Sequence, residues 1–356
     1  MKIKIGDITK IRTGKLDANA ADENGQYPFF TCSKNPLKIN TYSYDCECVL
    51  VAGNGDLNVK YYNGKFDAYQ RTYIIEDNSN GLLFMPYLYF FMESYMDELR
   101  KQSIGGVIKY IKLKNLTDAF IELPSIEVQR KIVNIISKAK EIVRRKENEF
   151  ELLDELVKAR FVEMFGDENN SKGWEIVNIE DVVNVQVGVV IKPSQYYTNQ
   201  YNGIKAFRSL NIGNGYIKDN DWVYFSKEGN KKNKKSILST NDVLVVRSGA
   251  PGTACVVTSE YAGSNAIDVI IAHPDFQKVD SHYLCTYTNM PHGKSQIIEG
   301  TGGAAQQHFN VGKYNKLKLM LPPLEYQKQY VKFLEEIDKS RLLSNHSLFL
   351  LKSMIF

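Results

Sequence analysis

The sequence contains the stretch LPSIEVQR at residues 123–130 and a second version of it, LPPLEYQK, at residues 321–328, 198 positions further on. Leu, Pro, Glu and Gln stand at the same four places in both versions. Proline is tolerated in the first turn of a helix, so each stretch predicts the start of one. Because the stretch recurs, we interpret the chain as a tandem duplication.

The segments upstream of the two stretches also match each other. CVLVAGNG at residues 48–55 parallels DVLVVRSG at 242–249, and GDITKI at 6–11 parallels IEDVVN at 179–184 more loosely. Gly105-Gly106 parallels Gly302-Gly303. Each repeat is therefore a mixed domain followed by a helix. We expect domains at residues 1–122 and 166–320, and helices at 123–165 and 321–356.

Apolar residues continue from each stretch at alternating spacings of four and three, which is the pattern of a coiled-coil seam. The first series is interrupted at Lys146, and the second at Arg341 and Ser344. The seam residues are Ile132, Ile136, Ala139, Val143, Phe150, Leu153 and Val157 in the first helix and Tyr330, Leu334, Ile337, Leu348, Leu351 and Ile355 in the second.

Helices of this length would extend roughly 50–60 Å at about 1.5 Å per residue, further than either domain is wide. The first helix leads into the second domain, so the second helix has to return alongside it. We therefore expect an antiparallel pair with approximate two-fold symmetry. The alternative is that each helix simply packs onto its own domain.

The two domains contain short strand-like runs separated by Gly, Asn and Asp turns. Examples are residues 49–52, 73–75, 243–246 and 269–271, while Pro86–Gln102 is a helical candidate. This mixture predicts an α+β fold with a strongly bent sheet in each domain.

The bulk composition is that of a globular protein. The chain has 356 residues, 43% hydrophobic, with a formal net charge of +4, which permits nucleic-acid binding without requiring it. There is no apolar run of about 18 residues and no signal-peptide pattern, so we expect neither a membrane span nor export. Five cysteines without a pairing pattern favour free thiols in a reducing cytoplasm.

Several turns carry groups suited to DNA. Glycines at residues 53–56 and 247–252 let a backbone approach phosphate, and Asn or Arg can bond two base-edge atoms at once. The lysine run at 231–235 would bind phosphate beside a groove, and the glutamines at 306 and 307 are of the type that reads adenine. Ordinary hairpin turns and a solvated lysine loop remain the alternatives. The candidate DNA-binding residues are Asn54, Asp56, Lys60, Arg71, Lys109, Tyr110, Arg208, Lys231, Lys232, Lys234, Lys235, Arg247, Ser248, Gln306, Gln307 and His308.

We find no catalytic motif. Asn35-Pro36 lacks the second proline and the aromatic residue of an amino-methyltransferase loop, and Thr288 stands where a nucleotide P-loop needs glycine. The five histidines form no H-E-x-x-H pattern. We therefore predict a binding protein with no catalytic residue and no metal site.

The paired Leu-Pro-x-x-Glu-x-Gln stretches, the helices after them and the Val-Leu-Val turn elements resemble the specificity subunit of type I restriction–modification systems, over essentially the whole chain. The resemblance implies two target-recognition domains, each reading half of a bipartite asymmetric DNA site. It also implies that the helices set the spacer and dock two modification subunits, which bind S-adenosylmethionine and methylate adenine N6.

Restriction subunits, which are ATP-driven nucleases, would join that core. The resemblance places S-adenosylmethionine, ATP and Mg on these partners and no cofactor on this chain. One departure is that Phe356 corresponds to Lys158, so Phe161–Phe165 have no counterpart. A subunit of a methylation-only complex and a non-catalytic protein-binding scaffold are the alternatives. An enzyme with a fused catalytic domain is disfavoured, because two domains and two helices already use the whole chain.

Overall fold

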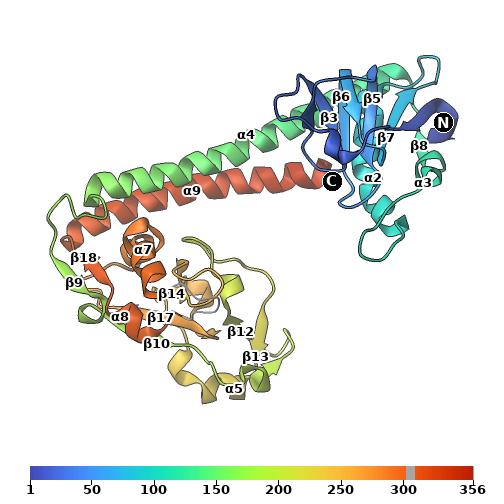
Figure 1. Cartoon of the computed structure of the whole chain (residues 1–356). Coiled ribbons are helices and arrows are strands. Elements are labelled where there is room, and N and C mark those ends of the chain that lie inside the picture. The colour runs from blue at the N-terminus through green and yellow to red at the C-terminus, as the bar shows by residue number, and fades with distance from the viewer. Residues whose placement is uncertain (302–308, 356) are drawn as a thin grey trace. The chain divides into compact units, whose positions relative to one another are not determined.

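The computed structural model describes residues 1–301 and 309–355, with the side chains at 300, 301 and 343–355 outside that description. The chain divides into two compact units, Met1–Glu147 with His346–Phe356, and Asn148–Asn345. Each unit contains one mixed domain, called domain 1 and domain 2 below (Figure 1). Two long helices, α4 (Ile126–Phe165) and α9 (Leu324–Ile355), each contribute residues to both units.

Domain 1 combines a mixed sheet with one long helix. Its elements are β1 (Lys2–Lys4), α1 (Ile5–Ile8), β2 (Thr9–Thr13), η1 (Ala18–Ala20), β3 (Tyr27–Phe30), β4 (Leu37–Ile39), β5 (Tyr44–Ala52), β6 (Val59–Ala68), β7 (Thr72–Asp77), α2 (Met85–Gln102), α3 (Leu113–Thr117) and β8 (Phe120–Glu122).

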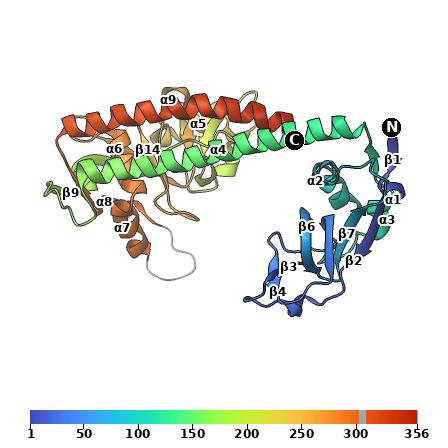
Figure 2. The same cartoon turned by 90° about the horizontal axis from the view of Figure 1, so that it is seen from above.

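The six strands of the main sheet follow the order β2-β7-β5-β6-β3-β4, and β1 pairs separately with β8. Side chains alternate between the faces of a strand. Val49 and Val51 of β5 accordingly pack towards α2, and Cys48 and Leu50 pack into a second cluster around Phe66. Figure 2 shows α2 beside this sheet. Both faces of β5 are thus buried, which explains its nearly continuous apolar run.

Domain 2 repeats this plan with additional short elements. They are β9 (Ile176–Asn178), η2 (Ile179–Asp181), β10 (Val183–Val187), η3 (Pro193–Tyr196), β11 (Tyr197–Thr198), β12 (Ile204–Phe207), η4 (Ser209–Asn211), β13 (Val223–Phe225), α5 (Lys227–Lys232), η5 (Lys234–Ser236), β14 (Val243–Val246), β15 (Ala254–Val256), η6 (Ser259–Tyr261), β16 (Asn265–Ala266), β17 (Val269–Pro274), α6 (Ser281–Asn289), α7 (Pro291–Thr301), α8 (Val311–Asn315) and β18 (Lys318–Met320).

The sheet of domain 2 is divided, which differs from the single bent sheet that the sequence predicts. One sheet has the order β10-β17-β14-β15 and the other β11-β13-β12-β16. In domain 1 the ten-residue strand β6 pairs with both β5 and β3. The corresponding stretch of domain 2 is interrupted by η6 and by Gly263, which has φ +85°. This interruption leaves β15 and β16 in separate sheets.

Matching registers confirm that the two domains share one plan. Lys2 pairs with Glu122 as Ile176 pairs with Met320, and Thr9 pairs with Asp77 as Val183 pairs with Pro274. The phenol of Tyr87 donates to the carbonyl of Glu122 (2.8 Å), and that of Tyr283 donates to Met320 (2.7 Å). The α+β class and the tandem duplication are confirmed.

The repeated glutamine holds the beginning of each long helix to its domain. Gln129 is fully buried; its Oε1 accepts from the amide of Phe84 (2.8 Å), and its Nε2 donates to the carbonyls of Leu82 (2.8 Å) and Pro124 (2.9 Å). Phe84 is the residue that precedes α2. The side chain of Gln129 therefore links the N-terminal end of α2 to the N-terminal end of α4.

Gln327 makes the same three contacts in domain 2. Its Oε1 accepts from the amide of Asp280 (2.8 Å), and its Nε2 donates to the carbonyls of Lys278 (3.1 Å) and Pro322 (2.8 Å). Asp280 caps α6. We call Gln129 and Gln327 the glutamine clamps. They give a physical reason for glutamine at this place in both repeats.

The predicted seam of α4 is its less exposed face. Every seam position from Ile132 to Val157 is half-buried, whereas the positions beside them are mostly exposed. Ile132 and Ile136 line a groove against α2, so this part of the seam contacts its own domain. Val157 and Leu334 pack against the core of domain 2. Packing onto the domains, the alternative considered above, therefore accounts for part of both seams.

Candidate nucleic-acid interface

The glycine turn after β5 gathers candidate residues of domain 1 at one edge of the sheet. Asn54 forms an isolated antiparallel bridge with Tyr110, and the amide of Gly55 donates to the carbonyl of Lys109 (2.9 Å). Gly55 has φ +70°, in a region that glycine adopts without strain. These contacts hold the loop at residues 103–110 against the turn.

Arg71, Asp56 and Lys60 join the same edge. The carbonyl of Arg71 accepts from the amide of Gly53 (2.8 Å), and Arg71 also lines a hollow of about 310 Å³. Lys60 donates to Asn58, whose side-chain amide donates to the carbonyl of Asp56 (2.8 Å). Burial lowers the pKa of Lys60. These contacts connect the six candidates of domain 1, three cations and one carboxylate among them, to the region of this turn.

Arg247 occupies the equivalent turn of domain 2 but points into the domain. Its side chain is 14% exposed; Nε donates to the carbonyl of Phe309 (3.0 Å), and Nη1 pairs with Asp268 (2.5 Å). The sequence suggests a base-reading arginine here. In this structure the guanidinium instead holds the turn to two distant segments. Ser248, beside it, is half-buried.

Arg208 and the lysine run of domain 2 lie beside the other sheet. Arg208 follows β12, and its guanidinium donates to the carbonyl of Asp221. Lys231, Lys232, Lys234 and Lys235 are exposed on α5 and η5, and Lys232 pairs with Glu228 (2.8 Å). Asn265 of β16 anchors this segment through Ser236 and Asn230. The lysine run thus belongs to a different part of the domain from Arg247. Gln306, Gln307 and His308 lie outside the described residues.

Helices α4 and α9 are antiparallel within the second unit. The hydroxyl of Tyr330 donates to the carbonyl of Val157 (3.3 Å), and its ring lies 5.5 Å from that of Phe161. Further along α9, Arg341 pairs with Asp154, which is earlier on α4. The residue numbers of the contacts fall along α4 as they rise along α9. The two helices therefore run in opposite directions here, as the sequence predicts. The side chains of the seam candidates Leu348, Leu351 and Ile355 are outside the described residues.

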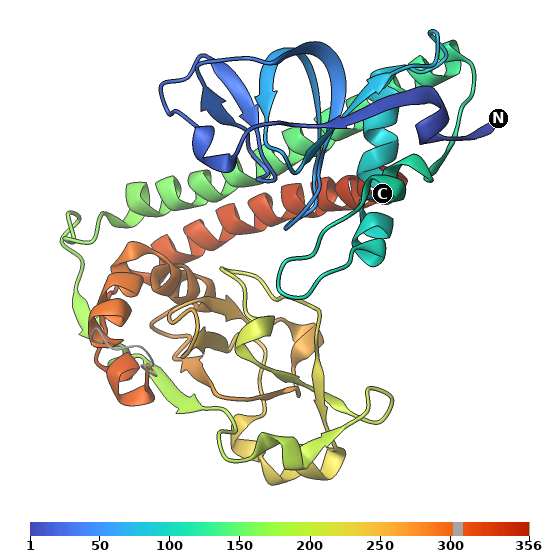
Figure 3. The ribbon, with the colours of Figure 1, turned by 45° about the vertical axis from the view of Figure 1, so that its right-hand side comes forward.

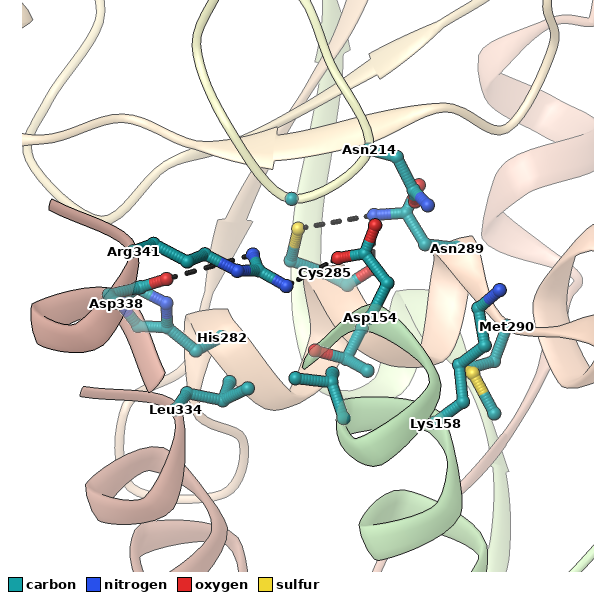
Figure 4. Close-up of a pocket in the computed structure, with 13 residues that line it drawn as sticks. Asp154, Lys158, Asn214, His282, Cys285, Asn289, Met290, Leu334, Asp338 and Arg341 are labelled. Carbon is teal, nitrogen blue, oxygen red and sulfur yellow. Dashed lines mark hydrogen bonds and ion pairs between the residues drawn. The ribbon is translucent and has the colours of Figure 1, made fainter. Parts of the chain in front are cut away.

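A polar cluster interrupts this helix pair at Arg341. Figure 4 shows its guanidinium between Asp154 of α4 and Asp338 of α9, the latter at 3.8 Å. A cavity of about 90 Å³ adjoins the cluster and is also lined by His282 and Leu334. Ligand pockets usually have about 300–1,000 Å³, so this space is too small for a nucleotide-sized cofactor. The ion pair between Arg341 and Asp154 therefore links α9 to α4.

Two kinds of residue escaped the sequence-based site prediction. The glutamine clamps are recognisable as repeats, but two of the three partners of each lie 45–49 positions away and have no sequence signal. Val107 and Ile108 are strongly exposed on the loop beside Lys109, although aliphatic residues are normally assigned to a core. An apolar pair directly after two glycines was the available signal in the sequence.

Among residues 1–301 and 309–355, no helix is both long and apolar enough to span a membrane. Within the same ranges, no cluster of three or more His, Cys, Asp or Glu side chains is arranged to hold a metal ion.

Comparison with known proteins places both repeats in one family. The model of the type I restriction modification DNA specificity domain matches residues 1–152 and 171–348. A 123-residue stretch, 35% of the chain, is 44% identical to the type I restriction enzyme EcoDI specificity subunit of Escherichia coli, and it spans 27% of that protein. The MjaVIII specificity subunit of Methanocaldococcus jannaschii is 22% identical over 94% of this chain and 85% of its own.

Solved structures share the fold. The S subunit of a type I restriction-modification system from M. genitalium has a TM-score of 0.62 at 14% identity, covering 100% of this chain and 93% of its own. A chain from a structure concerned with complex assembly and conformational transition of the type I R-M system has a TM-score of 0.59 at 14% identity, covering 100% of this chain and 95% of its own. Because the family model matches most of the chain, in two tandem regions, this protein belongs to the family of the type I restriction modification DNA specificity domain.

Proposed function

We propose that this chain is the non-catalytic DNA-recognition subunit of a type I restriction–modification complex. Each domain would read one half of a bipartite, asymmetric site. The observation that carries the proposal is that two domains keep one frame but present different groups at the equivalent turn. Domain 1 offers Asn54 and an exposed Arg71, while domain 2 has Arg247 and Asp268 paired with each other. Two readers with different surfaces suit two different half-sites.

The design also has a thermodynamic reason. Each correctly read base pair contributes about 1–3 kcal/mol, and one small domain reads few of them. Joining two readers makes the second binding event effectively intramolecular. A pair of continuous helices fixes the half-site separation better than a flexible linker would. In this proposal α4 and α9 set the spacer between the half-sites.

The chemistry would reside on partner subunits. Two modification subunits, bound to the helices, would carry S-adenosylmethionine and methylate adenine N6. Restriction subunits would bring ATP and Mg. The chain itself would bring these partners to the DNA sequence, and the exposed face of α4, with residues such as Ile135 and Leu152, is where we place their docking.

Mapping N6-methyladenine across the genome, with and without the gene, tests the proposal. We expect methylation to disappear at one bipartite motif, which would also give both half-sites and the spacer. If the maps are identical, binding of the purified chain to random-sequence DNA decides the question. Lack of sequence preference there would favour the scaffold alternative.

A change in helix length tests the spacer separately. Inserting about one turn into the exposed middle of α4, near Arg144, should lengthen the preferred spacer and leave both half-sites unchanged. A control insertion of the same length in the surface loop at residues 167–172 should not alter the half-sites. An unchanged spacer would refute the proposal that the helices set the distance between the half-sites.

A complex without restriction subunits would show the same methylation but no cleavage of unmethylated DNA.

A further inference from the structure

The loop between α2 and α3 exposes aliphatic side chains on the candidate DNA surface of domain 1. Val107 is fully exposed, Ile108 has 63% of its surface exposed and Ile104 43%. Figure 3 shows this loop projecting from domain 1. Exposed aliphatic clusters cost solubility, so they usually mark a binding surface.

Backbone hydrogen bonds define the shape of this loop. The amide of Ile104 donates to the carbonyl of Tyr110 (3.0 Å), and the amide of Tyr110 donates back to Ile104 (2.8 Å). These bonds close the tip around residues 105–109. Gly105 has φ +120°, and a side chain there would meet the carbonyl oxygen of Ile108 at 2.5 Å. The sequence therefore specifies a tight loop with Val107 at its end.

Further bonds hold the loop beside the polar readers. The amide of Ile111 donates to the carbonyl of Gly53 (2.9 Å), and the hydroxyl of Tyr73 donates to the carbonyl of Ile111 (3.2 Å). The tip thus adjoins the turn that carries Asn54. The candidates of domain 1 connected to that turn include the cations Arg71, Lys60 and Lys109, and Asp56 is the one carboxylate among the six. Polyanionic DNA matches this balance of charge better than an apolar protein face does.

We propose that Val107 and Ile108 form an apolar reading tip that contacts the bases of the first half-site. Its ligand is the apolar part of a base step in double-stranded DNA, either thymine methyl groups or the faces of a partly opened step. The inference rests on the proposed function and adds the chemistry of one reader. Domain 2 carries Ala304 and Ala305 at the corresponding sequence positions, so its side chains there are smaller than those of domain 1.

The test uses the full chain and a duplex with the motif found by methylation mapping. The variant Val107→Ala/Ile108→Ala should lose about ten-fold or more in affinity for that duplex. It should lose nothing on a duplex whose first half-site is scrambled. The salt dependence should stay unchanged, because no charge is removed. Uracil in place of thymine in the first half-site distinguishes the two ligands: weaker wild-type binding indicates methyl contacts, and unchanged binding indicates an opened step.

Leu82→Ala is the matched control. Leu82 is 57% exposed in the same domain, but it precedes α2, a helix of 18 residues and about 27 Å, whereas the tip follows that helix. It should leave the affinity for both duplexes unchanged. Unchanged binding by the tip variant, or an equal loss on both duplexes, would overturn the inference. If the wild-type chain itself shows no sequence preference, the proposed function fails instead.

Discussion

One aromatic position that the two domains share is buried to a different extent in domain 1 and in domain 2. Tyr283 of domain 2 is fully buried, stacked on Phe161 at 5.7 Å and in edge contact with Phe165 at 4.8 Å. Tyr87, its equivalent in domain 1, makes the same hydrogen bond to the last strand but is half-buried.

The difference teaches which contacts belong to the repeat and which to its place in the chain. The hydrogen bond belongs to the shared frame. The phenylalanine pair comes from the end of α4, the helix that enters domain 2. Domain 2 therefore has its entering helix built into its core, and its core depends on that helix.

The largest expected effect comes from emptying this aromatic cluster. Phe161→Ala should lower the free energy of unfolding of the second unit by about 3–5 kcal/mol, because it removes a fully buried ring and leaves a cavity. Both tryptophans, Trp174 and Trp222, lie in this unit, so urea unfolding followed by tryptophan fluorescence reports on it alone. Val162→Ala, at an exposed neighbouring position, should change stability by less than about 0.5 kcal/mol. Equal effects of both changes would show that the cluster is not part of the core.

The glutamine clamps should give the next largest effect, and a similar one in each domain. Gln327→Ala leaves one amide and two carbonyls without their partner, which should cost about 2–4 kcal/mol. Tryptophan fluorescence should report this loss. Gln129→Ala should leave that signal unchanged and increase amide hydrogen exchange in α2 instead.

Lys131→Ala and Lys328→Ala are controls at exposed sites of the same helix turns. A clamp variant that behaves like its lysine control would contradict the role given to glutamine. Both tryptophans report on the second unit. A fluorescence change with Gln129→Ala would therefore contradict the expectation that a change in the core of domain 1 leaves the core of domain 2 unaffected.

The sequence predicted the frame of each repeat better than its polar details. Period and repetition locate α4, α9 and the strands around Val49 and Val243, because burial imposes a pattern on neighbouring positions. The fate of Arg247 depends on Phe309 and Asp268, which are far away in sequence. The division of the sheet in domain 2 depends on a short interruption near Gly263, which has no strong signal of its own.

A smaller effect is expected where the helix pair carries Arg341. The first helix has Val143 at the equivalent seam position, so Arg341→Val makes the two seams alike. The stability should change by no more than about 1 kcal/mol, because Asp154 and Asp338 are both largely exposed. A double-mutant cycle with Asp154→Asn, followed by tryptophan fluorescence, measures the coupling. A coupling above about 2 kcal/mol would mean that this pair contributes far more to holding the helices together than exposed ion pairs do.

The smallest effect on stability is expected at Arg71, which contacts the glycine turn of domain 1, and it contrasts with that at Arg247 in the equivalent turn of domain 2. Arg71→Ala removes an exposed side chain, so stability should change by less than about 0.5 kcal/mol, while DNA affinity falls and the salt slope decreases by about one. Arg247→Ala breaks bonds to Phe309 and Asp268 and should cost about 1–2 kcal/mol of stability, measured by tryptophan fluorescence. If Arg247→Ala instead weakened DNA binding at unchanged stability, its guanidinium would have to leave Asp268 when DNA binds. The two turns would then read DNA in the same way, and the contrast between them would describe the free chain alone.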